Sequence, residues 1–437
     1  MLMVLQIDLA SPIVAQLLAV LIFVLTYFYI ATGRREHAIA ALAGVGGMWV
    51  SGLMTEEEML GFLDVDTLGL LFGMMIVAGG LTRAGFFRLV GIYLANLVQC
   101  RPFRMFVVLT ATTALLSAFL DNVTTVLFMI VVTIEIMKIL KLNPVPYIIG
   151  EVLAANIGGT ATLIGDPPNI MIAKVSQLSF LDFILNTGPP AVIGLIAVIL
   201  YFHFRLGKEL RREVSVREIP LKPEEIIADR RLFTIGAIIL SAMIVLFFIH
   251  EMLGVAPSTI ALGGAIVLLF LGGPNMPGVL EDVDWNTLLF IGSLFVVVGG
   301  LVKTGVIQEM SVQLSGVIGT NEALIVSGIM WMSSFASAFV DNIPFTAAFI
   351  PLLQDLANMT GTTSVALWWA LSLGAGFGGN GTIIASSATI AAMGVSRKHG
   401  YRITFKEFFR IGMPIMIIST LIGNFVLVAF MALGLYA

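Results

Sequence analysis

Two acidic dipeptides lie in the middle of long apolar runs, where a charge is costly to place. They are Asp121-Asn122, within SAFLDN, and Asp341-Asn342, within SAFVDN. On insertion scales a charged side chain at membrane depth costs about 2.5–3.5 kcal/mol, so each needs an explanation. An Asp-Asn pair can simply cap a helix, but its oxygens can also bind a cation or a proton. Because the pair occurs twice, we favour a binding role.

A second set of polar groups lies where glycine and proline interrupt apolar segments, in 156–169 (NIGGTATLIGDPPN) and 378–389 (GGNGTIIASSAT). Pro167 and Pro168 have no N–H to donate, so a helix must break there. Non-helical backbone at membrane depth is tolerated only where it is buried or lines a wet cavity. Such backbone would suit a hard cation, including Na⁺, or a polar solute, although a kink used only for helix packing is the alternative. The candidate residues are Asn156, Gly158, Gly159, Thr160, Thr162, Asp166 and Asn169, with Gly378, Gly379, Asn380, Thr382, Ser386 and Ser387.

Glu151 precedes the first interruption by seven residues and has leucine at the matching position, Leu371. It could carry protons or lie at a wet interface, and both interpretations stay open. Asp121, Asp341, Asp166 and Glu151 are therefore the proton-coupling candidates.

The elements that hold these residues must be membrane helices. Of 437 residues, 58% are hydrophobic and only 11% are charged, with a mean hydropathy of +1.02, whereas soluble domains carry about 25% charged residues. Several apolar runs reach the roughly 20 residues that span a bilayer, and they recur to the end of the sequence. We expect an all-α polytopic membrane protein in the plasma (inner) membrane.

Composition and motifs also argue against several functions. The single cysteine, Cys100, cannot form an intrachain disulfide or a cysteine metal cluster, and the four histidines show no metal-ligand spacing. The sequence contains no P-loop, no HExxH motif and no Ser-His-Asp arrangement. We expect no cofactor, no resident metal centre, no nucleic-acid partner and no enzymatic activity.

The chain repeats itself at an offset of 220 positions. GGLTRAG at 79–85 matches GGLVKTG at 299–305, and GGTATLIG at 158–165 matches GGNGTIIA at 378–385. We therefore predict a first repeat over 1–206, a linker over 207–231 and a second repeat over 232–437. In the first repeat we expect spans at 11–33, 36–53, 67–99, 145–176 and 186–206. The segments 103–140 and 323–360 are predicted to be helical hairpins that either cross fully or re-enter.

Five crossings in each repeat would insert the two copies with opposite orientations, as in inverted-repeat transporters. The positive-inside rule supports this topology. If the linker 207–231 is cytoplasmic, every lysine and arginine except Lys174 and Lys303 falls on the cytoplasmic side. Both termini should then face outward. Near the inner surface, we expect Glu135 to pair with Lys138.

At these motifs the chain resembles the ion-transporter superfamily that includes arsenite permeases (ArsB), NhaD-type sodium/proton antiporters, citrate permeases and divalent anion/sodium symporters. The stretch GGTATLIGDPPN is most similar to the branch that contains the melanocyte P protein. The resemblance implies that both hairpin tips meet two unwound helices near the bilayer midplane, with ions and substrate bound between them. At the first tip it adds Thr124 to Asp121 and Asn122 as a binding residue. It also implies a homodimer whose transport domain slides against a scaffold in an elevator-like motion.

One departure from that family pattern bears on coupling. Sodium/dicarboxylate relatives carry Ser-Asn-Thr at each hairpin tip, whereas this chain has Asp-Asn-Val and Asp-Asn-Ile. A carboxylate can take up a proton and would repel a doubly charged anion. We therefore expect a proton-coupled secondary transporter that exports arsenite, antimonite or a similar small inorganic solute, with Na⁺ as the other possible coupling ion. An arsenite system could also include a peripheral ATPase subunit.

Other functions remain as alternatives. A sodium/proton antiporter of NhaD type and an anion or citrate permease are the alternatives within transport, and an ion channel is a more remote one. Two intramembrane aspartates could also form a protease dyad. The Gly-x-Gly-Asp motif of such enzymes is absent, and an inverted duplication has no role in that chemistry.

Overall fold

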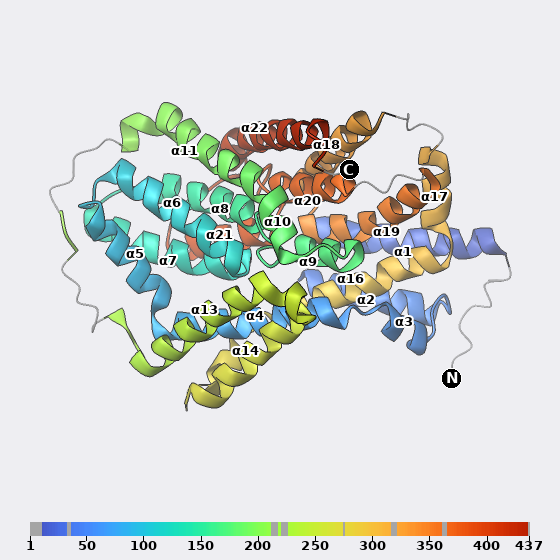
Figure 1. Ribbon diagram of the computed structural model, residues 1–437, viewed down its shortest axis with the longest axis horizontal. Coiled ribbons are helices and arrows are strands. Elements are labelled where there is room, and N and C mark those ends of the chain that lie inside the picture. The colour runs from blue at the N-terminus through green and yellow to red at the C-terminus, as the bar shows by residue number, and fades with distance from the viewer. Residues whose placement is uncertain are drawn as a thin grey trace.

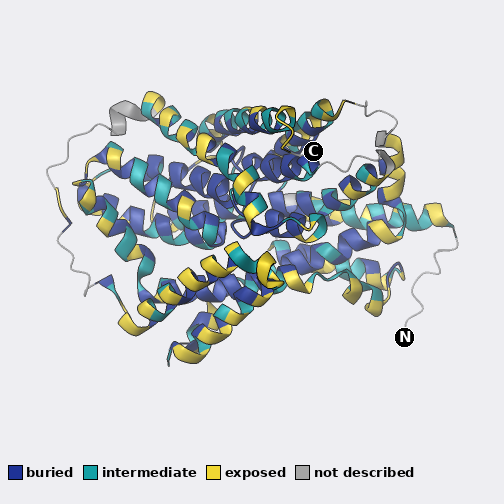
Figure 2. Ribbon diagram, in the orientation of Figure 1, coloured by how far each residue is buried: buried dark blue, intermediate teal, exposed yellow. Residues whose placement is uncertain are grey.

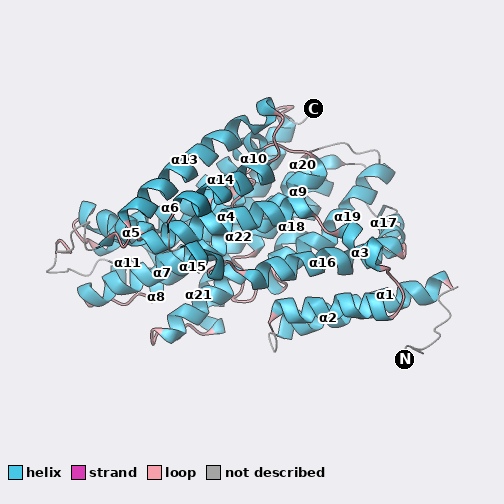
Figure 3. Cartoon of the chain, turned by 90° about the horizontal axis from the view of Figure 1, so that it is seen from below, coloured by secondary structure: helices cyan, strands magenta, loops and turns pink. Residues whose placement is uncertain are grey.

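The computed structural model describes residues 11–32, 36–210, 217–219, 226–273, 276–315, 321–360 and 365–435. Over these residues the chain consists of helices and connecting loops, with no β-strand (Figure 3). Nine of the described helices are long and apolar enough to cross a membrane. The predicted all-α, multi-span fold is confirmed.

The helices before the linker, here called the first half, contain every type of element that the sequence predicts: long spans, a hairpin and a broken helix (Figure 1). Their bounds are α1 Pro12–Thr32, α2 His37–Val50, α3 Glu56–Phe62, α4 Val65–Ala84, α5 Phe86–Leu97, α6 Pro102–Phe119, α7 Asn122–Leu140, α8 Val145–Thr160, α9 Pro167–Ser176, α10 Phe180–Asn186 and α11 Gly188–Leu210.

The helices after the linker, the second half, repeat this order. The hairpin helices α18 and α19 begin and end 220 positions after α6 and α7. The bounds are α13 Arg230–Leu253, α14 Pro257–Leu271, α15 Met276–Glu281, α16 Trp285–Lys303, α17 Val306–Ser315, α18 Glu322–Phe339, α19 Asn342–Thr360, α20 Ala366–Gly378, α21 Ser387–Lys398 and α22 Phe405–Ala432.

The two halves pack reciprocally around an approximate two-fold relation. Helix α2 packs on α16 while its counterpart α14 packs on α4, and α9 packs on α19 while α21 packs on α7. The pairs α1–α2 and α13–α14 lie on opposite flanks of the molecule (Figure 3). Each half thus completes the other. The boundaries 1–206 and 232–437 and the opposite membrane orientation of the halves stay predictions.

Two of the predicted spans differ from the observed helices. The expected span 67–99 is divided at Gly85, whose φ of +90° is a left-handed conformation that glycine adopts easily, so α4 ends there and amphipathic α5 begins. Gly305, with a φ of +79°, divides α16 from α17 in the same way. The expected span 36–53 contains a shorter helix, α2, of 14 residues.

The most deeply buried helices are the ones on which the site depends. Every residue of α8 from Pro146 to Thr160 is buried, and so is α20 except for Trp368. Figure 2 shows these helices inside the molecule, while α13, α14 and α11 turn exposed faces outward. The exposed faces carry large apolar side chains such as Leu246 and Phe270, as expected for helices that face lipid.

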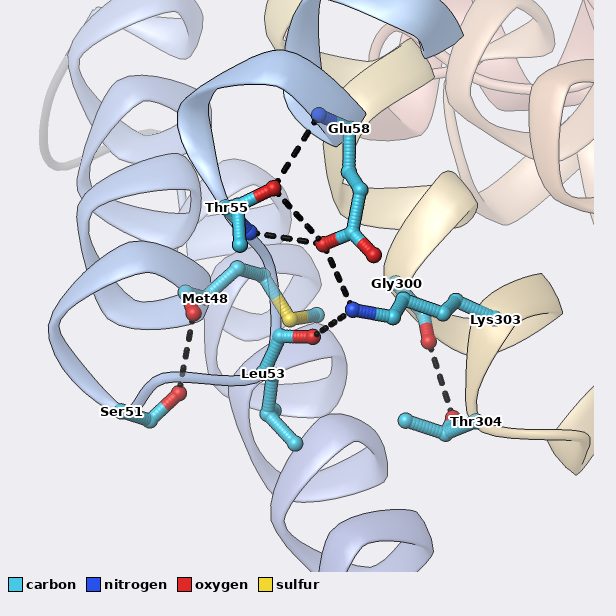
Figure 4. Close-up of polar contacts among 8 residues, drawn as sticks. All are labelled: Met48, Ser51, Leu53, Thr55, Glu58, Gly300, Lys303 and Thr304. Atoms are coloured by element: carbon cyan, nitrogen blue, oxygen red, sulfur yellow. Dashed lines mark hydrogen bonds and ion pairs between the residues drawn. The ribbon is translucent and has the colours of Figure 1, made fainter.

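Ion pairs tie the ends of the long flanking helices to neighbouring loops. Lys303, at the end of α16, donates to the carbonyl of Leu53 (3.0 Å) and to Glu58 (2.6 Å), as Figure 4 shows. Glu58 also accepts from the backbone N–H of Thr55 (2.8 Å). At the matching end of α4, Arg83 pairs with Asp282. The corresponding helix ends of both halves are therefore anchored by a basic side chain.

Residues 211–216 and 220–225 of the predicted linker 207–231 lie outside the described residues, as do the chain ends. One described part, residues 217–219, is held against α5, because the Asn96 side chain binds both the N–H (2.8 Å) and the carbonyl (3.2 Å) of Ile219. The expected pair of Glu135 with Lys138 is wrong. Glu135 pairs with Arg88 at 3.2 Å, because packing of α5 against α7 brings that guanidinium closer.

The Glu58 pair predicts a specific pH dependence of stability. The hydrogen bond from Lys303 and then the N–H of Thr55 lower the pKa of Glu58 from 4.5 to about 2. A lowered pKa gives stability that is present above pH 4.5 and lost as the pH falls towards 2. In thermal unfolding of the purified protein, the midpoint temperature of wild type should exceed that of Glu58→Gln by a constant difference above pH 4.5. That difference should vanish near pH 2.

The control is Glu56→Gln on the same short helix, since Glu56 forms no ion pair among the described residues. That variant should match wild type across the range. A margin for Glu58→Gln that persists unchanged down to pH 2 would contradict the assigned pairing.

Candidate functional site

Each hairpin tip is a helix N-terminus capped by the predicted aspartate. Helix α6 ends at Phe119 and α7 begins at Asn122, and the Asp121 carboxylate accepts from the N–H (2.9 Å) and the hydroxyl (3.0 Å) of Thr124. At the other tip, Asp341 accepts from the N–H of Ile343 (3.0 Å) and from the hydroxyl of Ser387 (2.7 Å). Both tips are buried. The predicted capping is confirmed, and it uses only part of each carboxylate.

Both glycine-rich segments are broken helices, as the sequence predicts. Helix α8 ends at Thr160 and α9 begins at Pro167, while α20 ends at Gly378 and α21 begins at Ser387. The two prolines lie in the first turn of α9, where an N–H is not needed. They therefore start the second helix piece rather than interrupt a continuous one.

Glycines at the breaks allow backbone to approach backbone. A Cβ on Gly158 would lie 2.1 Å from the carbonyl oxygen of Ala114 on α6, and one on Gly165 would lie 2.6 Å from that of Ser117. In the second half, a Cβ on Gly378 would lie 2.6 Å from the carbonyl oxygen of Ser334. Each broken helix thus lies directly against the first arm of its own hairpin, which fixes the hairpin tip beside the break.

Matched hydrogen bonds join each hairpin arm to its broken helix. Ser117 and Ser337 donate to the carbonyls of Ala155 and Ala375, both at 2.8 Å. Thr162 and Thr382 donate to the carbonyls of Ala118 and Ala338, and Thr160 donates to the carbonyl of Asn156 (2.7 Å). These threonine hydroxyl protons are therefore committed to the backbone, so the three oxygens can only accept from a ligand.

Two asparagines connect the broken helices of the two halves. The Asn156 amide donates to Gly379 O and Asn380 Oδ1, both at 3.0 Å, and its oxygen accepts from Ser386 (3.1 Å). The Asn169 amide donates to three carbonyls at the first break, that of Thr162 being nearest at 2.8 Å.

The oxygen of Asn169 accepts from Ser372 on α20 at 2.7 Å. The two interrupted segments are thus held together by side chains that contact their exposed backbone. The site is composite, since neither half supplies all of these partners.

Asp166 lies at the centre of this arrangement, at the start of α9. It accepts from the Asn342 amide of the opposite hairpin tip at 2.9 Å, and Asn122 of its own half's tip lies near enough to influence it. Asp121 and Asp341 both interact with it electrostatically. Three buried carboxylates and two tip asparagines therefore lie in one buried region of the molecule.

Several polar atoms at this place have no partner within the described structure. They are Asp121 Oδ1, Asp166 Oδ1 and Asn380 Nδ2. A buried polar atom without a hydrogen bond costs about 1–3 kcal/mol, so the two carboxylate oxygens are poised to bind a proton, a cation or a donor, and the Asn380 amide is poised to donate to a solute or water. None of the ion pairs among the described residues involves the three carboxylates. No group of three or more His, Cys, Asp or Glu side chains in the described parts has the geometry of a metal site.

A cavity of about 430 Å³ leads from the surface towards the first break. Its outer wall includes His250, Glu251 and the ion pair of Lys174 with Asp66, and its inner wall reaches Leu163 in the interrupted segment. It lies between α9 and the flanking helices α4, α13 and α14. This cavity therefore reaches the interrupted segment from one side.

The predicted residues thus gather at one place, with one exception. Glu151 lies deeper along α8, where it accepts from Thr133 at 2.6 Å and is fully buried, away from any wet interface. Two contributors were missed. Ser372 lies in an apolar run that gives no polar signal, and Tyr27 of α1 donates to the Pro344 carbonyl beside Asp341.

Comparison with known proteins identifies the family. The model of the citrate transporter family CitMHS matches residues 27–374. The chain belongs to the CitMHS family. Two uncharacterized transporters of Mycobacterium tuberculosis are each 37% identical to it, over 414 and 408 residues, which are 93% and 92% of this chain and 97% and 95% of theirs.

More distant relatives support the same placement. The human P protein is 31% identical over 98% of this chain, which spans 60% of that longer protein. The crystal structure of the Alcanivorax borkumensis YdaH transporter, described as having an unusual topology, matches with a TM-score of 0.64 at 13% identity, over 97% of this chain and 99% of that one. That likeness concerns the fold. This CitMHS member is therefore a multi-pass membrane transporter, and the more specific ArsB or NhaD type is not established by these matches.

The close approach at Gly158 gives a testable prediction. Gly158→Ala should push α8 away from α6, and overpacking of this kind typically costs about 1–3 kcal/mol. We expect a lower midpoint of thermal unfolding in detergent. Gly394→Ala on α21 is the matched control, because nothing lies within 4 Å of a Cβ there and alanine favours a helix. Equal midpoints for the two variants would contradict the packing described here.

Proposed function

We propose that this CitMHS member is a secondary active transporter that couples solute movement to protons at the three buried carboxylates. The observation that carries the proposal is the meeting of Asp121, Asp166 and Asp341, with an unpartnered oxygen on two of them. Carboxylates held out of water are costly when charged. Binding and releasing protons, or a cation, is the direct way for such a site to change its charge between the two faces of the membrane.

The charge of the site bears on the solute. No described lysine or arginine hydrogen-bonds to the three carboxylates, so a free multivalent anion would meet like charge with no lysine or arginine paired to offset it. An uncharged trihydroxide such as arsenite or antimonite would instead find amide and hydroxyl partners, among them Asn380, Ser386 and Ser387. Our first proposal is therefore proton-coupled export of arsenite, antimonite or a similar small inorganic solute.

Citrate is the second candidate, because the family model is described as a citrate transporter. On the same electrostatic argument, citrate would have to bind with its charge reduced by protons or by a bound cation. A sodium/proton antiporter is the third, with Na⁺ held by carboxylate and freed backbone oxygens near Leu163 and Ile164. An ion channel would need a continuous pore, and the buried contacts of Asn156 and Asn169 between the halves disfavour one.

Alternating access completes the proposal. The cavity at Lys174 and Asp66 separates the flanking helices from the central ones, and an elevator-like shift of the central helices would open the opposite side. We also propose a plasma-membrane location with both termini outside and the linker 207–231 cytoplasmic. The homodimer and, for an arsenite system, a peripheral ATPase subunit stay predictions from the resemblance.

Flux into proteoliposomes discriminates these candidates. Uptake of arsenite, antimonite or citrate is measured under an imposed pH gradient, an imposed Na⁺ gradient, or neither. The proposal expects saturable uptake driven by the pH gradient. Uptake driven only by Na⁺ would favour Na⁺ coupling, and single-channel conductance in planar bilayers would replace the transporter by a channel.

Replacing the hairpin-tip aspartates separates binding from capping. Asparagine is as good a helix cap as aspartate, so Asp121→Asn and Asp341→Asn should keep the thermal stability of the protein. They should nevertheless abolish pH-driven flux, because the amide cannot take up a proton. Asp355→Asn on α19 is the control, and its flux should equal that of wild type. Unchanged flux in both tip variants would contradict proton coupling at these residues.

A further inference from the structure

Glu151 is a fully buried carboxylic acid that takes no part in the central site. The Thr133 hydroxyl of α7 donates to its Oε1 at 2.6 Å, and its Oε2 has no partner among the described residues. An ionisable side chain inside a membrane protein is costly and is by default a sign of function. The question is whether the fold requires a polar group at this position.

The corresponding positions in the second half of the chain serve as an internal control. Helices α18, α19 and α20 pack on one another as α6, α7 and α8 do. Three buried polar residues of the first half, one on each of α6, α7 and α8, have apolar counterparts 220 positions later, and all six side chains are fully buried. The pairs are Thr110 and Met330, Thr133 and Leu353, and Glu151 and Leu371. The same packing is therefore achieved without a carboxylate or hydroxyls.

Thr110 adds a third polar atom to the same region. Its hydroxyl has no hydrogen-bond partner in the described structure, and it lies close to Gly150, the neighbour of Glu151 on α8. Polar atoms from three helices are thus collected at one buried place in one half only. Packing alone gives no reason for that.

The position of Glu151 along α8 places it between the surface and the central site. A crevice of about 270 Å³ at the start of α8 is lined by Arg205, Glu407 and Arg410 and reaches Ile149, two residues before Glu151. In the other direction, Asn156 of the central site is five residues on, about 7.5 Å along the helix axis. Glu151 therefore lies on α8 between the residues that line the crevice and Asn156 of the central site.

One other titratable side chain of α8, Tyr147, is buried one turn before Glu151, and its hydroxyl donates to the Pro102 carbonyl at 3.0 Å. The helices packed against α8 are α6, α7, α11, α20, α21 and α22. The titratable side chains described on them are exposed or partly exposed, except for Asp121, which belongs to the central site; they are Arg104, Glu135, Lys138, Tyr201, His203, Arg205, Arg397, Lys398, Lys406, Glu407 and Arg410. None of them hydrogen-bonds to Glu151, whose carboxylate therefore has only Thr133 as a polar partner in the described parts.

We propose that Glu151 and Thr133 form a second proton-binding site, which passes protons between the crevice at the start of α8 and the central carboxylates. Oε2 takes and releases the proton, while Thr133 holds Oε1 and fixes the orientation of the acid. Only the first half has this proton-binding site, so the proposed paths of protons to the two faces of the membrane differ. The inference rests on the proposed proton coupling and names one residue of its route.

Infrared difference spectroscopy tests the site without transport. Purified wild-type protein is titrated with acid and base, and the C=O band of protonated carboxylic acid is compared with that of Glu151→Gln. Glu135→Gln is the matched control, since it removes an exposed carboxylate of the neighbouring helix α7. We expect one titrating buried-acid band to be lost in Glu151→Gln and kept in Glu135→Gln. Identical spectra for Glu151→Gln and wild type would overturn the proposal.

Flux measurements test the route. The double variant Glu151→Leu with Thr133→Leu copies the second half and should fold with wild-type thermal stability. Both it and Glu151→Gln should lose pH-driven flux at least tenfold while binding solute with unchanged affinity. Wild-type pH dependence in both variants would overturn the inference. If wild type itself shows no pH-driven flux, the proposed function fails, and the infrared comparison still decides whether Glu151 binds a proton.

Discussion

The structure depends on which groups form hydrogen bonds with the polar backbone and side-chain atoms that are buried in the membrane. In a lipid environment each unpaired N–H or C=O is costly, so interrupted helices survive only when other parts of the protein supply partners. Here the partners come from both halves. Asn156 binds the backbone at the second break, and Asn169 binds the backbone at the first while accepting from Ser372 of α20. The same cross-links that make the breaks tolerable also bring the hairpin tips and Asp166 together.

The two halves of the site have nearly the same backbone arrangement but differ in the chemistry of their side chains. The hydrogen bonds of Ser117 and Ser337 are matched between halves, and so are the close approaches at Gly158 and Gly378. In contrast, the position of the second repeat that corresponds to Asp166 is a serine, Ser386. The duplicated scaffold thus supplies the two matched tip carboxylates, Asp121 and Asp341, and the difference between Asp166 and Ser386 adds the third.

Much of this site could be predicted from the sequence, because its signals are local. An Asp-Asn pair in an apolar run indicates a buried cap, a Gly-Gly followed by Pro-Pro indicates a break, and the 220-residue offset relates the two copies. The remaining contacts depend on tertiary packing. Glu135 lies three residues from Lys138, yet Arg88 from α5 is its partner. Ser372 and Tyr27 carry no local signal, and their roles follow only from which helices become neighbours. Likewise, Gly85 could be read as part of a long span until its left-handed conformation is seen.

Accessibility of the site tests the central claim most directly, namely that this buried polar cluster is a solvated chamber that opens to each face in turn. Ser387, beside Asp341, is partly exposed, and Cys100 is the only cysteine to remove. In a Cys100→Ala background, Ser387→Cys is treated with membrane-impermeant thiol reagents from either side of oriented membranes. We predict labelling from one face at rest, labelling from the other when the driving gradient is reversed, and slower labelling with transported solute present. A cysteine that stays unreactive from both faces in folded, active protein would contradict the account.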